Sequence, residues 1–264
     1  MIDTHCHLTY PGLRDRLPEV LAGARDAGLA GTISVGTSPA DATAAQAIAN
    51  SNPDVWFTAG IHPLHSDEIT DPDTAIAHLR HLLADPRCVA LGELGLDNHY
   101  PTPPPEVQRP IFQAQLQLAH DHADRPIVIH NRKATDQVLT VLREYDIPGP
   151  RCVFHCFTGS AAELHAILDY GAMVSLTGIV TFKSAGDLAD ASDRIPLDRL
   201  MVETDSPYLT PAPHRKIKTN EPKYVTDVAR FLAEQRGMTY ADFEAATDAN
   251  AHRFFNLSAS APLS

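Results

Sequence analysis

Six residues of the kinds that bind metal ions are spread along the chain, each at the end of an apolar run. They are His5, His7, Glu93, His130, His155 and Asp205. Scattered ligands at repeated strand ends are hard to explain as core filling. They are the expected product of a barrel whose parallel strands end at one mouth. We therefore predict one site in which a metal-dependent reaction runs.

The first two histidines follow the apolar start of the chain as an HxH pair. Residues two apart in a strand point to the same side, so His5 and His7 should aim together into the barrel while Cys6 points away. Imidazole suits Zn²⁺, Mn²⁺ and similar ions. The alternative is two structural histidines whose hydrogen bonds are satisfied at a strand end.

Glu93 follows the apolar run CVALG. A buried carboxylate is costly unless it is paired or bound to a metal, and its two oxygens could bridge two cations. His130 and His155 each close an apolar strand, where a single histidine is more often structural. Asp205, in VETDSP, could instead cap the following turn. The repeated placement of these residues favours the metal site over each separate alternative.

The ligands divide into two groups that share one carboxylate. The first ion is assigned to His5, His7, Glu93 and Asp205, and the second to Glu93, His130 and His155. We predict two divalent ions, with Mg²⁺, Mn²⁺ and Zn²⁺ all open. Two such ions carry four positive charges and the two carboxylates subtract two, so the site should favour anionic substrates.

Basic residues follow two of the predicted strands. One cluster is Asn131, Arg132 and Lys133, and the other is His214, Arg215, Lys216 and Lys218. Arginine binds phosphate in bidentate fashion, so Arg132 and Arg215 are expected to contact a phosphate ester. His62, in AGIHP, could contact the scissile phosphate or protonate the leaving oxygen. Its alternative role is a supporting hydrogen bond.

Positioning these residues requires alternating strands and helices. The predicted strands are Ile2–Thr4, Gly31–Val35, Val55–Ala59, Cys88–Leu91, Ile127–Ile129, Cys152–Phe154, Ala172–Leu176 and Leu200–Glu203. Apolar residues at helical spacing predict helices over Leu13–Ala27, Asp41–Asn50, Asp73–Ala84, Glu106–His120, Ala134–Tyr145, Ala161–Tyr170, Lys223–Gln235 and Ala241–Asn256, the last on the outside of the barrel. This alternation predicts an α/β protein with a (β/α)8 TIM barrel. An open doubly wound sheet fits less well, because no GxGxxG turn follows the first strand.

The totals are those of one globular domain over residues 1–264, with Pro101–Pro105 read as a loop. The four cysteines form no CxxC pair, so we expect no disulfide. No apolar stretch approaches the ~18 residues of a membrane span. No signal peptide is visible, and a cytoplasmic protein is expected.

The net charge of −12 argues against attraction of nucleic acid to the protein surface as a whole. Binding of an anionic substrate should therefore depend on local basic residues.

Seven strings taken together, DTHCHL, GIHP, GELGLD, IHNR, HCFTG, ETDSP and NEP, closely resemble the TatD family of metal-dependent deoxyribonucleases. The similarity runs almost from end to end in the same order. It implies an amidohydrolase-like TIM barrel that cleaves DNA, with exonuclease action expected. By position it implies the same six metal ligands, and it places His62 near the substrate. Thr9, Lys133 and Thr219 depart from the family pattern, which affects phosphate contacts rather than ligands.

The predicted reaction is metal-assisted phosphodiester hydrolysis on DNA or another phosphate ester. Asp205 would accept or orient the proton of the attacking water, Glu93 would bridge the ions, and His62 would assist the leaving oxygen. One alternative is an amidohydrolase acting on a small cyclic amide or lactone. Another is a metal-binding scaffold without enzymatic activity. No membrane and no obligate protein partner is predicted.

Overall fold

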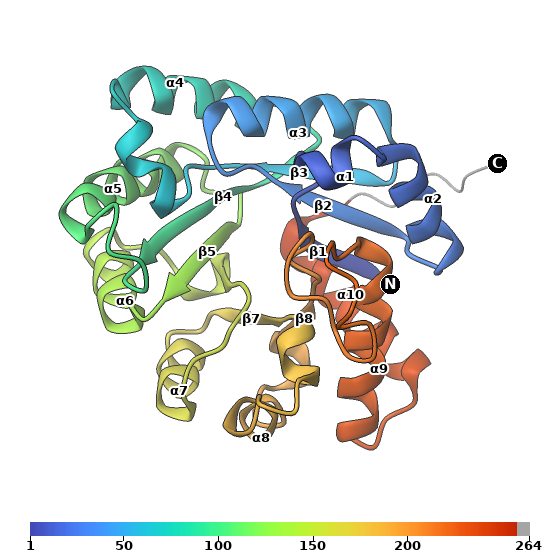
Figure 1. Cartoon of the computed structure of the whole chain (residues 1–264). Coiled ribbons are helices and arrows are strands. Elements are labelled where there is room, and N and C mark those ends of the chain that lie inside the picture. The colour runs from blue at the N-terminus through green and yellow to red at the C-terminus, as the bar shows by residue number, and fades with distance from the viewer. Residues whose placement is uncertain (258–264) are drawn as a thin grey trace.

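Eight parallel strands in sequential order, β1 to β8, form the centre of the computed structural model, which describes residues 1–257 (Figure 1). The strands are β1 (Ile2–Cys6), β2 (Gly31–Val35), β3 (Val55–Ala59), β4 (Cys88–Asp97), β5 (Ile127–Arg132), β6 (Cys152–Phe154), β7 (Met173–Leu176) and β8 (Leu200–Val202). The predicted (β/α)8 barrel is confirmed. All eight predicted strand segments overlap these strands.

The first and last strands meet through the residues that follow β8. Asp205 donates its backbone N–H to the carbonyl of His5 at 2.9 Å, and His7 donates to the carbonyl of Ser206 at 2.7 Å. The Thr4 hydroxyl also donates to the Val202 carbonyl at 3.0 Å. These contacts bring the segment after β8 alongside the end of β1, so residues about 200 positions apart in sequence lie side by side.

Helices connect successive strands and surround the sheet (Figure 1). They are α1 (Pro11–Arg14), α2 (Leu17–Asp26), α3 (Pro39–Ser51), α4 (Pro72–Leu83), α5 (Pro105–Asp121), α6 (Thr135–Glu144), α7 (Ala161–Asp169), α8 (Asp187–Ser192), α9 (Val225–Gln235) and α10 (Tyr240–Phe255). Short 3-10 segments are η1 (Pro63–Glu68), η2 (Gly149–Arg151), η3 (Gly178–Thr181), η4 (Leu197–Arg199) and η5 (Pro222–Tyr224). None of the described helices is both long enough and apolar enough to cross a membrane.

Local sequence explains where several helices begin. Ser38 and Asp71 each accept a backbone N–H at the start of a helix, and each is followed by proline at the first helical position. Ser160 and Glu163 form a reciprocal capping box at the start of α7. The predicted first helix, Leu13–Ala27, is instead divided into α1 and α2. Pro18 lacks a backbone N–H, which is least costly in the first turn of a helix, and it is the second residue of α2, which begins at Leu17.

Three strands run further than predicted, which changes the position of the ligands. β1 continues to Cys6, β4 to Asp97 and β5 to Arg132. His5, Glu93 and His130 therefore lie inside strands rather than after them. The register of β4 against β5 shifts between Leu91 and Leu94. Gly95 allows this close pairing, because a Cβ atom there would collide with the His130 carbonyl.

The barrel interior has an apolar half. Each strand contributes at least one residue to a buried cluster, which contains Ile2, Ile33, Trp56, Val89, Ala90, Val128, Val153, Met173 and Met201. Ala251 and Phe255 of α10 and the following Leu257 join this cluster. The last helix was expected to pack outside the barrel. α10 packs against α9 and β8, and these residues of it also join the interior cluster. α8 was not predicted, because its six residues give fewer than two turns for a periodic pattern.

Candidate metal centre

The opposite half of the barrel, where the strands end, contains a cavity of about 720 Å³. Five of the six predicted ligands line it, namely His7, Glu93, His130, His155 and Asp205. His5 is fully buried beneath them, within reach of two of the lining carboxylates. The six residues come from five segments of the chain, and the fold brings all of them together.

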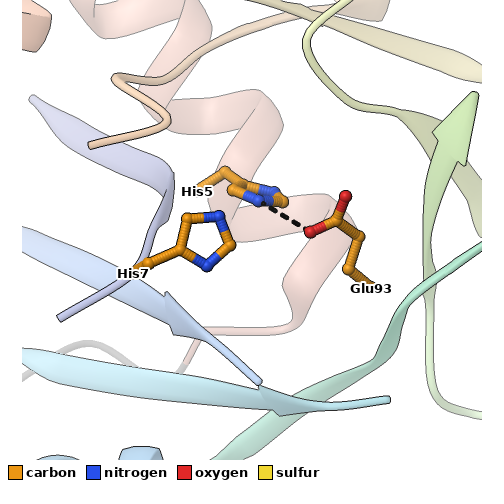
Figure 2. A group of neighbouring side chains, drawn as sticks. All are labelled: His5, His7 and Glu93. Carbon is orange, nitrogen blue, oxygen red and sulfur yellow. Dashed lines mark ion pairs between the residues drawn. The ribbon is translucent and has the colours of Figure 1, made fainter. Parts of the chain in front are cut away.

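Glu93 is the centre of this arrangement. Its Oε1 atom lies 2.6 Å from His130 Nδ1 and 2.7 Å from His155 Nε2. Its Oε2 atom lies 3.4 Å from His5 Nε2, the contact drawn in Figure 2. Only 2% of its surface is exposed. One buried carboxylate therefore faces histidines from β1, β5 and the end of β6.

Asp205 faces the β1 histidines from the other side. Its Oδ1 atom lies 3.2 Å from His7 Nε2 and 3.7 Å from His5 Nε2. The backbone of Asp205 has a φ of 53°, a left-handed conformation that aspartate tolerates better than most residues. That conformation, together with its N–H bond to His5, holds the carboxylate over the end of β1.

These residues fit divalent metal ions. His5 makes no hydrogen bond through either ring nitrogen although both are buried. Buried polar atoms are normally satisfied, so such nitrogens indicate missing partners. Ligand atoms of His5, His7 and Glu93 lie within 4.8 Å of one another, as do those of His62, Glu93 and His130. Nitrogen and carboxylate donors of this kind suit Zn²⁺ and Mn²⁺.

Without metal, the pKa shifts indicate that Glu93 is ionised and that neighbouring histidines hold protons. Burial alone would raise the pKa of Glu93, but the charge of the nearby His155 and the hydrogen bond from His130 hold it well below its usual range. Burial would lower the pKa of His155, yet the carboxylate charge of Glu93 raises it well above normal. Burial and the His155 charge lower the pKa of His5. A metal ion entering the site must therefore displace protons.

His62 lies closer to the cluster than its sequence position suggested. Its Nε2 atom is 3.1 Å from His130 Nδ1 and 3.4 Å from Glu93 Oε1. Its Nδ1 atom accepts the backbone N–H of Leu64, which fixes the ring and leaves the proton on Nε2. Burial and the charge of His130 lower its pKa to about 4. A neutral ring favours phosphate contact over protonation of the leaving oxygen.

The two predicted arginines occupy different places. Arg132 lines the cavity and lies over the Tyr100 ring, 5.2 Å from its centroid. Arg215 lies 3.7 Å from the centroid of the Phe182 ring and does not line the cavity. Lys133, Lys216 and Lys218 are also absent from the described lining residues. Of the predicted arginine and lysine side chains, only Arg132 lines the cavity with the predicted ligands.

Two carboxylates beside the cluster were not predicted. Asp97, at the end of β4, accepts a hydrogen bond from His130 Nε2 at 3.0 Å. Glu203, directly after β8, lies 3.4 Å from His155 Nδ1 and accepts the Cys156 N–H at 2.7 Å. Each carboxylate orients a histidine whose other nitrogen faces Glu93, as in the carboxylate–histidine pairs of many metal sites. In the sequence, these two residues are the acidic residues that close the apolar runs in LGLD and VETD.

Two buried glutamines of α5 hold the strand ends that carry these groups. The Gln108 side chain accepts the Asp97 N–H and donates to the Asp97 carbonyl, both at 2.8 Å. Gln115 makes the same pair of bonds with Ile61, at 2.8 and 3.0 Å. Ile61 precedes His62, so one helix positions residues on both the β3 and β4 sides of the cavity.

Comparison with known proteins agrees with this geometry. A family model described as TatD related DNase matches residues 2–256. The metal-dependent hydrolase YcfH of Escherichia coli K12 is 37% identical, over 98% of this chain and 97% of that protein. A protein of Erwinia billingiae named 3′-5′ ssDNA/RNA exonuclease TatD is also 37% identical, over 98% of this chain and 100% of that protein.

Among solved structures, the TatD homologue YJJV of Escherichia coli K12 aligns with a TM-score of 0.90 and 27% identity, covering 98% of both chains. Amidohydrolase and lactonase structures also align, with lower TM-scores and lower identities. The whole-chain match and the converging histidines and carboxylates lead to one conclusion: the chain belongs to the TatD-related DNase family of metal-dependent hydrolases.

Proposed function

We propose that this hydrolase is an exonuclease that removes nucleotides from single-stranded DNA or RNA with two divalent ions. The observation that carries the proposal is the position of Glu93, whose two oxygens face separate histidines in a cavity rimmed by Arg132. The Erwinia relative, whose name specifies single-stranded DNA and RNA, supports the substrate class. The negative net charge leaves nucleic-acid binding to local contacts at this mouth.

The metal assignment divides the cluster at Glu93. His5, His7, Glu93 and Asp205 would hold one ion, and Glu93, His130 and His155 the other. Divalent ions supply Lewis acidity and make water a stronger acid at neutral pH. Mg²⁺, Mn²⁺ and Zn²⁺ remain the candidates. We also propose that residues 1–264 belong to one barrel domain.

The protein's own groups have separate tasks in the proposed reaction. Asp205, held over β1 by its backbone bond to His5, accepts or orients the proton of the attacking water. Arg132, at the cavity wall, offsets charge on the phosphate oxygens. His62 donates a hydrogen bond from its Nε2–H to the phosphate, because its Nδ1 atom already accepts the Leu64 N–H. A phosphate contact by Arg215 stays a separate prediction.

The test is digestion of single-stranded DNA and RNA carrying a 5′ label, with each candidate metal added in turn. A 3′-5′ exonuclease produces a ladder that shortens from the 3′ end. Metal-stripped protein should produce none, and full turnover after stripping would refute the scheme. A parallel panel of cyclic amides and lactones separates the amidohydrolase alternative. Bound metal without turnover on either panel would instead favour the scaffold.

A further inference from the structure

Tyrosine side chains gather at the mouth of the metal cavity. The described residues include four large hydrophobic side chains classed as exposed, and three of them line this cavity. They are Tyr10, Tyr100 and Tyr208, with 42%, 46% and 53% of their surface exposed. Single exposed aromatic residues need no explanation, but a concentration around one cavity marks a binding surface.

Tyr10 and Tyr208 form one pair, on the loops that follow β1 and β8. Their ring centroids are 6.0 Å apart at 65°, an edge-to-face contact. The Tyr208 ring also meets the His7 ring, with centroids 6.2 Å apart. This pair therefore stands directly beside the β1 and β8 side of the ligand cluster.

Tyr100 and Arg132 form a second pair, after β4 and at the end of β5. The guanidinium lies 5.2 Å from the Tyr100 ring centroid, and the backbone N–H of Tyr100 donates to Asp97 at 3.3 Å. Asp97 is the carboxylate that orients His130. In a barrel of eight strands in sequential order, β4 and β5 lie opposite β8 and β1. The two pairs therefore face each other across the metal cluster.

We propose that these two pairs are base-stacking platforms on either side of the scissile phosphate. This role rests on the function proposed above and explains how the enzyme would select its nucleic-acid substrate. Aromatic rings and arginine planes stack on any base without reading its sequence. Both pairs accept a base only if it is free of a partner strand. The rim thus selects unpaired nucleotides on both sides of the cleaved bond, with little sequence preference.

The test uses Tyr100→Leu and Tyr208→Leu, which keep apolar bulk but remove the ring, and the matching Tyr→Phe variants, which keep the ring. Tyr240→Leu is the matched control. Tyr240 begins α10, and Arg230 lies 4.6 Å from its ring centroid, but it does not line the cavity. Each protein is assayed on a single-stranded oligonucleotide and on the same strand with abasic sites at its two 3′-terminal nucleotides. Fluorescence anisotropy of both strands, with chelator present, measures binding without turnover.

Each Leu variant should raise KM and weaken binding about 5- to 150-fold on the base-containing strand, the range expected for one lost stacking contact. The abasic strand should already bind poorly to the unaltered protein and should respond little to the same variants. Each Phe variant should recover most of the binding that the Leu variant at the same position loses, and Tyr240→Leu should match the unaltered protein. Equal losses on both strands, or unchanged binding in both Leu variants, would overturn the inference. No cleavage of any strand by the unaltered protein, with binding still dependent on the rings, would instead overturn the proposed function.

Discussion

The two halves of the barrel interior are built from the same eight strands, but one half is apolar and the other is polar. The half near the strand starts contains Ile, Val, Met and Trp56, closed by residues of α10 and Leu257. The half near the strand ends contains buried histidines and carboxylates, some with ring nitrogens that lack hydrogen-bond partners. Burial of the apolar half stabilises the fold. The polar half leaves buried ring nitrogens without hydrogen-bond partners.

The residues that stabilise the barrel therefore lie near the strand starts, and the residues of the candidate metal site lie near the strand ends. Substitutions in the apolar half should change the free energy of unfolding and leave the metal site intact. Substitutions in the polar half should change metal binding and turnover with smaller effects on folding. Each of the following experiments challenges one side of that separation.

The largest effect is expected for Glu93→Ala. Removing the carboxylate that faces both histidine groups should abolish turnover and bound metal together, with the circular dichroism spectrum unchanged. Activity and metal content by mass spectrometry are the measurements. Glu68→Ala is the control, because that carboxylate is exposed in η1 and contacts only His65 among the ion pairs described. Turnover retained by Glu93→Ala would remove Glu93 from the proposed mechanism.

Trp56→Ala tests the apolar half. Truncating this buried ring should cost about 3–5 kcal/mol of unfolding free energy, the usual range for a large core aromatic. Urea unfolding measures the loss, and metal content per folded molecule should stay constant. A drop in metal affinity at temperatures where the variant remains folded would show that the two halves are coupled.

Asp97→Asn tests the orientation of His130 from outside the ligand set. The amide keeps the size of the side chain but loses the charge that faces His130 Nε2. Metal affinity or activity should fall roughly 10- to 100-fold, as for other carboxylates behind a histidine ligand. Titration calorimetry with the metal separates a loss of affinity from a loss of kcat. An unchanged affinity would indicate that the carboxylate only holds the loop at Tyr100.

The smallest effect is the pH dependence of the metal-free protein. Carboxylate partners, opposing burial, raise the pKa of His7, His130 and His155 in the folded state. Their stabilisation is complete below the unfolded value near 6.5 and is lost as pH rises through the folded values. Stability should fall by on the order of 1 kcal/mol per pH unit above 6.5. Thermal unfolding with chelator measures it. A rise in Tm over that range would contradict the assigned protonation.

The sequence predicted the barrel well because its strands are apolar on both faces and its helices are periodic. The eight strand segments and seven of the helical segments needed only local patterns. The division of the first helix and the extension of β4 depended on backbone details. Apolar periodicity does not reveal the register shift between Leu91 and Leu94, so Glu93 was placed at a strand end.

The candidate site was predicted as a set of residue types rather than as a geometry. Histidines and carboxylates at strand ends could be selected by position alone. Asp97 and Glu203 were missed because their role appears only when the register places them behind His130 and His155. Arg215 was assigned to the mouth from its charge, but its guanidinium stacks on Phe182 away from the cavity lining.

The bonds of α5 to Ile61 and Asp97 make two walls of the cavity depend on one helix. If α5 loosens, His62 and His130 lose their alignment at the same time, while the other strands keep their ladders. Heat inactivation of the enzyme should therefore precede global melting. Among the buried amide protons, those of Ile61 and Asp97 should be the first to exchange with deuterated water.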